Sequence, residues 1–377
     1  MRGPEDSCSP SFRELCQRDA GRDGTEWLTC LDALAAAVGA APKADMHVHL
    51  EGAVCPYRGR RIRGPGGCCG GQPGSYEDLA RRFTHHLLEF RGYAQYRDAV
   101  IRFAESCYSE GVVYAEVSVS PIGPLLSGVR VLDIFHGLMD GAQFARDRWQ
   151  VEIRFEVEFY RGAPIDVVLM MTDAAAPFAG HTIVALGTAG SEGRMSLRPY
   201  LSAFEIAHSI GLLVTPHAGE MCGPKSVWDA LEIKPDRIKH GGASLGDDAL
   251  CERLVQSAVP LDMSLLSNIR LGYATSLNTH PFRGLTRRGI TCGVGADDPA
   301  ILGTTIIDEY VSAAILGADP QALAESSVAV SGLDQVTASA VRQRISGFDW
   351  SACDTALSRL ALLRDADRGH CGARPKT

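Results

Sequence analysis

Residues 43–52 read Lys-Ala-Asp-Met-His-Val-His-Leu-Glu-Gly, a strand-like run that carries two histidines. Residues two apart on a β-strand point to the same side, so the imidazoles of His47 and His49 would enter one space. Two neutral imidazoles that converge from the end of a strand are half of a zinc site that keeps one coordination position for water. His-x-His alone is a weak motif, so its meaning depends on the rest of the chain.

Three further motifs follow apolar runs in the same way. They are His217-Ala-Gly-Glu220, Arg237-Ile-Lys-His240-Gly241 and Asp297-Asp298-Pro299. Each motif alone is weak, and Asp297-Asp298-Pro299 would by itself be an ordinary turn or helix start. Their shared position after strand-like runs favours one common site.

These runs belong to a regular alternation of short β-branched stretches with amphipathic ones, which is typical of βα units and a parallel sheet. Strands are predicted at residues 44–49, 112–118, 151–159, 182–187, 212–217, 237–240, 260–264 and 291–296. Eight strands in 377 residues fit one (β/α)8 TIM barrel, in which catalytic groups come from the carboxyl ends of different strands.

Helices are predicted between and after these strands, at residues 96–110, 196–210, 225–231, 248–258, 305–316 and 320–330. The last two are extra C-terminal helices beyond the final strand. Residues 1–41 are expected to form a helical N-terminal extension and residues 42–365 a single metal-dependent hydrolase barrel. Residues 366–377 are expected to be a frayed tail.

The composition excludes several classes of partner. A formal net charge of −8 argues against nucleic acid or an anionic membrane as the main partner. No apolar run approaches the roughly 18 residues of a membrane helix, and the charged start lacks the apolar segment of a signal peptide. The expected location is therefore the cytoplasm. The 12 cysteines are scattered without a Cys-x-x-Cys motif, which favours reduced thiols over a disulfide framework.

The residue types indicate metal-assisted hydrolysis. Three neutral imidazoles and one carboxylate hold a Zn²⁺ ion at roughly 2.0–2.2 Å, and zinc is favoured over iron or manganese by ligand type. The bound water falls from a pKa near 16 towards roughly 7. Glu220, just beyond its strand, is placed for proton donation to the substrate, and His240 is the candidate that orients or deprotonates the water. Strand alternation turns Asp298 away from Asp297, so Asp298 is a candidate for accepting a hydrogen bond from the substrate.

Taken together, the chain resembles the adenosine and adenine deaminase family of the amidohydrolase superfamily over roughly residues 42–330. The same order of motifs also includes Tyr114-Ala-Glu-Val-Ser-Val-Ser-Pro121, Gly190-Ser-Glu192, Ser267-Asn268 and His280-Pro281. The resemblance implies that zinc is bound by His47, His49, His217 and Asp297. It implies that Glu220 protonates ring N1 as hydroxide attacks C6, that His240 assists the water and that Asp298 accepts from the N7 side. The backbone of Gly190 would lie against the purine edge. The implied reaction is hydrolytic deamination of a 6-aminopurine, with release of ammonia.

Departures from the family pattern leave the substrate open. Glu51 stands where adenosine-specific members usually carry the Asp that meets the ribose 5′-hydroxyl. With Ser191-Glu192, it looks closer to members that act on adenine or on modified nucleosides. Gly187 replaces a frequent acidic residue, and the Arg/Gly/Cys-rich residues 57–75 stand where relatives carry helices that cover the substrate. The alternatives are a deaminase of another heterocycle or adenosine derivative, and a catalytically silent purine-binding barrel.

Several other polar residues have ordinary interpretations. Glu116 and Glu192 either take part in function or tie down a loop, and His280 is expected to cap a helix or brace the loop after the seventh strand. Ordinary structural roles are expected for six histidines: His85, His86, His136, His181, His208 and His370.

Overall fold

The computed structural model describes residues 10–20, 25–55 and 73–370, and within them all eight predicted strands are present. The strands are β1 Lys43–His49, β2 Val112–Val119, β3 Glu152–Tyr160, β4 Ile183–Ala189, β5 Leu213–Ala218, β6 Ile238–His240, β7 Leu261–Met263 and β8 Cys292–Val294. They pair in sequence order, and every pair is parallel. The predicted TIM barrel is confirmed.

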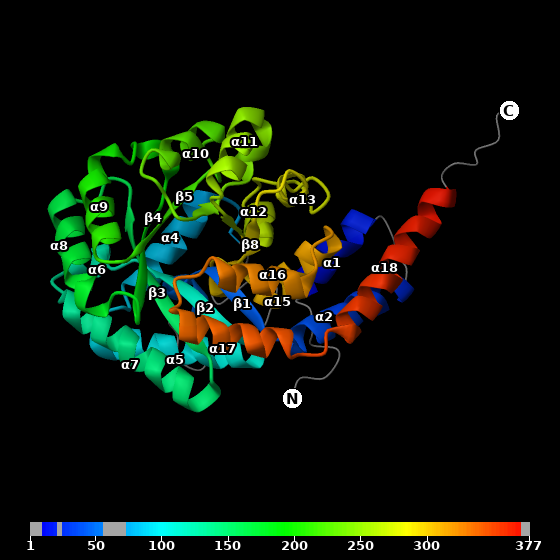
Figure 1. Ribbon diagram of the computed structural model, residues 1–377, viewed down its shortest axis with the longest axis horizontal. Helices are drawn as coiled ribbons and strands as arrows, with labels where there is room; N and C mark the ends of the chain where they lie inside the picture. Colours follow the sequence, from blue (N-terminus) through cyan, green and yellow to red (C-terminus); the bar gives the residue numbers. More distant parts are fainter. Residues whose placement is uncertain (1–9, 21–24, 56–72, 371–377) are drawn as a thin grey trace.

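Helices surround this barrel (Figure 1). Their bounds are α1 Pro10–Ala20, α2 Thr25–Ala40, α3 Leu50–Ala53, α4 Tyr76–Leu87, α5 Tyr93–Ser109, α6 Ile122–Leu126, α7 Val131–Trp149, α8 Ile165–Ala175, α9 Leu201–Ser209, α10 Pro224–Leu231, α11 Asp248–Ser257, α12 Leu265–Arg270, α13 Phe282–Arg287, α14 Pro299–Leu302, α15 Ile306–Ile315, α16 Pro320–Ala329, α17 Gln335–Ser346 and α18 Ser351–His370. No helix of the described residues is long and apolar enough to cross a membrane.

The sequence prediction missed several of these helices, among them α4, α7, α8, α17 and α18. Helix α9 begins at Leu201 rather than near residue 196, because a short 3-10 turn at Arg198–Tyr200, with a proline in it, precedes it. Most of the Arg/Gly/Cys-rich stretch at 57–75 lies outside the described residues. Its last residue, Ser75, caps α4 by accepting a hydrogen bond from the backbone N–H of Asp78.

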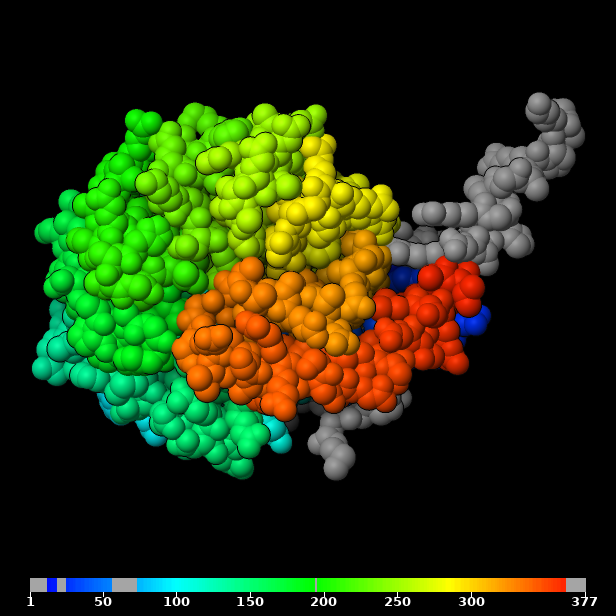
Figure 2. Space-filling view, viewed as in Figure 1, coloured from blue at the N-terminus to red at the C-terminus, as the bar shows by residue number. Residues whose placement is uncertain are grey.

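The N-terminal and C-terminal helices meet on one side of the barrel. Helix α2 packs against α15 and α18, and α16 packs against β1 and β8. In Figure 2 the orange and red surface of the C-terminal helices forms one band beside the green and yellow βα units. The predicted domain division after residues 41 and 365 stays a prediction.

The barrel closes where β8 meets β1. The backbone N–H of Asp297 donates to the carbonyl of His47 (2.8 Å), and the N–H of His49 donates to the carbonyl of Asp297 (2.9 Å). Gly295 makes this approach possible, because a Cβ added there would overlap the backbone of His47. The closure therefore fixes the relative position of the first and last site motifs.

We expect Gly295→Ala to destabilise the protein by about 1–3 kcal/mol, the usual cost of overpacking a closed core, and to weaken metal binding by displacing His47. Chemical denaturation and metal content of the purified protein measure the two effects. Gly123→Ala is the matched control, since a Cβ at this helical position meets nothing within 4 Å. Equal stability of Gly295→Ala and Gly123→Ala would contradict the importance of this contact.

Candidate metal centre and active site

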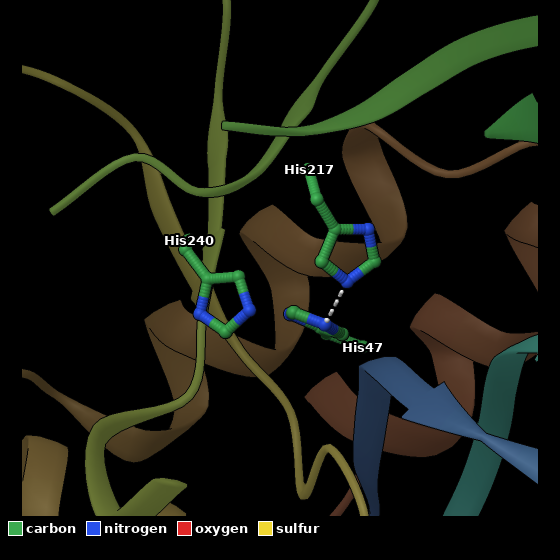
Figure 3. A group of neighbouring side chains, drawn as sticks. All are labelled: His47, His217 and His240. Atoms are coloured by element: carbon green, nitrogen blue, oxygen red, sulfur yellow. Dashed lines mark hydrogen bonds between the residues drawn. The ribbon is translucent and has the colours of Figure 1, made fainter. Parts of the chain in front are cut away.

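Three imidazoles converge inside the carboxyl end of the barrel (Figure 3). His47 comes from β1, His217 from β5 and His240 from the end of β6, and all three are buried. The Nε2 atoms of His47 and His217 are 3.1 Å apart, and the ring centroids of His47 and His240 are 4.6 Å apart. Residues that are far apart in the sequence thus share one small space.

In two of these rings, those of His47 and His217, the Nδ1 nitrogen faces a backbone carbonyl. Nδ1 of His47 lies 2.9 Å from the carbonyl of Asp262, and Nδ1 of His217 lies 2.5 Å from that of Thr188. A carbonyl only accepts, so each Nδ1 carries the proton, and each neutral ring turns its Nε2 lone pair inward. Burial lowers the pKa of both histidines well below the usual value, which keeps them neutral. Two lone pairs facing each other at 3.1 Å fit a cation held between them.

A carboxylate and a further imidazole complete this cluster. Oδ1 of Asp297 is 3.5 Å from Nε2 of His49 and 3.9 Å from Nε2 of His47. Ligand atoms of these three residues all lie within 4.8 Å of one another, as do those of His47, His217 and His240. The described residues therefore include a buried His/Asp cluster of the kind that binds a metal ion, and its residue types suit zinc.

Glu158, on β3, contacts two imidazoles of this cluster through its carboxylate. Its Oε2 is 3.2 Å from Nδ1 of His49, and its Oε1 is 3.5 Å from Nδ1 of His217. Burial lowers the pKa of His49, but the negative charges of Glu158, Asp298 and Asp297 together outweigh burial and raise that pKa to about 10. The site therefore favours positive charge at His49, as a proton or as a cation at Nε2.

Glu158 is also part of a network of buried ion pairs. Lys239 bonds to Glu156 (2.7 Å) and Glu158 (2.9 Å), while Arg237 bonds to Glu156 (2.9 Å), Asp262 (2.8 Å) and also Glu116. This answers the open question about Glu116, which belongs to the ion-pair network and not to the metal cluster. The sequence signal for Glu158 was the alternation of charged and apolar residues in β3, which puts Arg154, Glu156 and Glu158 on one face.

Two residues of the site have an unusual backbone conformation. His240 and Asp297 have φ values of 63° and 61°. The other non-glycine residues with positive φ among those described, Gln150, Lys234 and Ala258, lie at or just beyond helix C-termini, where this conformation is common. In contrast, His240 and Asp297 lie at strand ends, and such strain, of order 1–3 kcal/mol each, collects where function dictates side-chain direction.

Glu220 follows β5 and faces His240, with 3.6 Å between Oε2 and Nε2. Burial, together with the neighbouring carboxylates Asp297, Glu192 and Asp298, raises the pKa of Glu220 well above its usual value. The raised pKa favours the protonated form of its carboxyl group, which suits a donor.

The loop that carries Glu220 is held by Glu192. The Glu192 carboxylate accepts hydrogen bonds from the backbone N–H groups of Gly219 (3.1 Å), Glu220 (2.9 Å) and Cys222 (3.3 Å). Of the two interpretations of Glu192 left open by the sequence, the geometry supports the one in which it ties down a loop. Because that loop carries Glu220, Glu192 also positions the candidate proton donor.

The predicted substrate-binding residues, Glu51, Asp298 and Gly190, also lie at the carboxyl end of the barrel. Glu51 is buried and accepts from the backbone N–H of Ser120 at 2.9 Å, while its Oε2 has no hydrogen-bond partner among the described residues. Oδ1 of Asp298 is likewise buried and without a hydrogen bond, beside the backbone of Gly52. Gly190, with φ of 80°, lies against Tyr160. Unsatisfied buried acceptors of this kind fit a site that a ligand completes.

Helix α4 lies over this part of the site. The Phe83 ring is edge-on to the ring of His49, with 5.9 Å between the centroids. Phe83 and Tyr76 pack on a small apolar cluster of Leu79, Leu271, Ile301 and Leu302. Helix α4 thus supplies an apolar wall next to the imidazoles, although no helix was predicted here from the sequence.

The remaining histidines for which bonds are known are satisfied away from the cluster, as expected. His86 bonds to the carbonyl of Glu51, His181 to that of Pro177, and His208 to the Asp236 carboxylate. His280 accepts from the backbone N–H of Phe282, the first residue of α13, as the capping interpretation predicts, and it also bonds to Asn268.

Comparisons with known proteins agree with one another on the family and the fold. A family profile described as "Adenosine deaminase" matches residues 72–346. Aminodeoxyfutalosine deaminase of Acidothermus cellulolyticus is 31% identical over 345 residues, which cover 86% of this chain and 96% of that protein. Adenine deaminase of Agrobacterium fabrum is 30% identical over 287 residues, covering 72% of this chain and 86% of that protein. The crystal structure of an amidohydrolase from Burkhoderia ambifaria, with bound zinc, has the same fold, with a TM-score of 0.72 at 18% identity and coverage of 87% of this chain and 94% of that one.

We expect Glu192→Gln to loosen the loop that carries Glu220, because an amide replaces one acceptor oxygen by a donor that faces backbone N–H groups. Turnover should fall by up to about 100-fold, the scale of a misplaced catalytic group. Hydrogen exchange at the amides of Gly219, Glu220 and Cys222 should become faster.

The matched control is Glu232→Gln, which removes a carboxylate from an exposed pair with Arg198 and should leave both readouts unchanged. Unchanged exchange at Gly219, Glu220 and Cys222 in Glu192→Gln would rule out the anchoring role.

Proposed function

Because the chain belongs to the adenosine deaminase family, whose members are deaminases of purine-like substrates, we propose that it is a zinc-dependent hydrolase of a 6-aminopurine. It would replace the exocyclic amino group at C6 by oxygen and release ammonia. The observation that carries the proposal is the pair of inward Nε2 lone pairs of His47 and His217, next to Asp297 and with Glu220 facing His240 at 3.6 Å.

In this proposal His47, His49, His217 and Asp297 would hold the metal ion. Zinc, when bound, would supply a water of lowered pKa as the nucleophile. The chain's own residues then orient the reactants. His240 faces the cluster from β6 and orients or deprotonates the water, while Glu220, on the neighbouring loop, delivers a proton to ring N1 of the purine. Protonation of N1 makes C6 more electrophilic, so the two groups act on the same N1–C6 bond.

Asp298 and Gly190 are proposed to bind the purine. The unsatisfied Oδ1 of Asp298 would accept a hydrogen bond on the N7 side, and the left-handed backbone of Gly190 would lie against the purine edge. The apolar wall around Phe83 excludes bulk water and so strengthens the electrostatic interactions inside the site.

The identity of the 6-aminopurine is the finer question. The relative named aminodeoxyfutalosine deaminase matches over nearly its full length, which supports an adenosine derivative as substrate. The adenine deaminase relative supports free adenine. Glu51 favours either over plain adenosine, because its buried carboxylate takes the place of the usual shorter Asp and already bonds to Ser120. A different heterocycle and a silent purine-binding barrel are the remaining outcomes of the test.

The test is the change in ultraviolet absorbance of adenine, adenosine, 5′-modified adenosines and N6-substituted adenosines, with zinc content measured in the same sample. We expect turnover of at least one adenine-containing compound, with plain adenosine poor. Glu220→Gln should abolish turnover and retain zinc, whereas His217→Ala should lose both.

Turnover retained by His217→Ala would end the proposal. Zinc-loaded protein that binds a purine but never changes its absorbance would instead support a silent barrel. A strong preference for plain adenosine would contradict the role given to Glu51.

A further inference from the structure

A chain of side-chain hydrogen bonds runs from the start of α13 to His240. The backbone N–H of Phe282 lies 3.2 Å from Nδ1 of His280, and Nε2 of His280 lies 3.2 Å from Oδ1 of Asn268. Nδ2 of Asn268 is 3.3 Å from Nδ1 of His240 and 3.5 Å from Oε1 of Glu220. This series of hydrogen bonds therefore ends on His240 and Glu220, the two groups proposed to act on the water and on the purine ring.

The direction of every bond in this chain follows from its first donor. A backbone N–H only donates, so Nδ1 of His280 must accept from Phe282. Burial lowers the pKa of His280 to about 3, so the ring is neutral and its single proton is on Nε2. That proton is donated to Asn268, whose amide oxygen must therefore face His280.

The orientation of the Asn268 amide then decides the tautomer of His240. With its oxygen facing His280, Asn268 presents its NH₂ group to His240 and Glu220. Nδ1 of His240 accepts from this NH₂ group, so the proton of the neutral imidazole lies on Nε2, the nitrogen closer to Glu220.

We propose that Asn268 and His280 are positioning residues that hold His240 in its Nε2–H tautomer, so that His240 donates a hydrogen bond into the cluster. This rests on the proposed function and chooses between the two roles left open for His240. A ring protonated on Nε2 orients the attacking oxygen by donating to it, and it cannot accept a proton at that nitrogen. The second amide proton of Asn268 is directed at Glu220, so one side chain aligns both groups.

A purely structural explanation is that Asn268 braces the loop after α12. The backbone carbonyl of Asn268 already does this, since it accepts from the N–H groups of Tyr273 (2.8 Å) and Ala274 (3.0 Å). The Asn268 side chain points away from these bonds and toward two site residues. Its orientation is therefore not needed to close the loop.

The experiment uses zinc-loaded full-length protein with ¹⁵N-labelled histidine. Long-range proton–nitrogen correlation spectra distinguish the two imidazole tautomers, and loss of one signal set in His240→Gln assigns His240. We expect Nε2–H in the unsubstituted protein. In Asn268→Asp, which offers only acceptor oxygens, the proton should move to Nδ1, and kcat should fall by about 10–100-fold with KM changed much less.

Two further variants keep the test sharp if Asn268→Asp folds poorly. His280→Leu removes the donor to Asn268 and should give a mixture of His240 tautomers with a reduced kcat. His280→Gln keeps an N–H donor and should restore most of the Nε2–H tautomer and most of kcat. His86 is another buried histidine, but it takes no part in these hydrogen bonds, so His86→Leu should leave the His240 signals unchanged.

A proton on Nδ1 of His240 in the unsubstituted protein would overturn the proposal, as would His240 signals that are the same in His280→Leu and the parent. These spectra need no turnover, so they separate this inference from the proposed reaction. A protein with the expected tautomer but no activity on any purine would disprove the proposed function and leave the hydrogen-bond chain intact.

Discussion

The contact between β1 and β8 is the constraint on which the rest of the site depends. Two backbone hydrogen bonds join His47 and His49 to Asp297, and Gly295 allows the strands to come that close. Through this contact the two histidines that start the barrel and the aspartate that ends it come within reach of one cation. Without closure, residues 250 positions apart would share no metal, because no local contact joins them.

The interior below the cluster is charged where such a barrel is usually filled with branched apolar side chains. Glu116, Glu156 and Glu158 meet Arg237 and Lys239 in full burial. Burying these ions costs desolvation energy, and removing a single partner from such a pair typically costs about 3–5 kcal/mol. The network has a local consequence, since it ends on Glu158, which contacts the imidazoles of His49 and His217. The same charges thus position two rings and make the site favourable for a cation.

Residues around the metal cluster position the proposed catalytic groups. Glu192 holds the backbone of the loop that carries Glu220, and Asn268 touches the side chains of Glu220 and His240. His240 and Asp297 adopt left-handed backbone conformations at strand ends, a cost that the surrounding hydrogen bonds offset. The alignment of acid, imidazole and metal ligands is therefore a property of several loops acting together.

By itself, the sequence determined the eight strands, the TIM barrel and the family, and it predicted residues that the structure brings together in one buried cluster. Strand alternation puts His47 and His49 on one side, and parallel strands bring their carboxyl ends to one edge, so local pattern is enough for these. Helices α4, α7, α8, α17 and α18 were not predicted, although Leu79 and Phe83 of α4 recur at helical spacing. The tertiary structure alone decided that Glu192 anchors a loop, that Glu158 supports His49, and that Asn268 and His280 reach His240. Each of these depends on which residues of distant segments lie opposite one another, and the periodicity within one segment does not determine that.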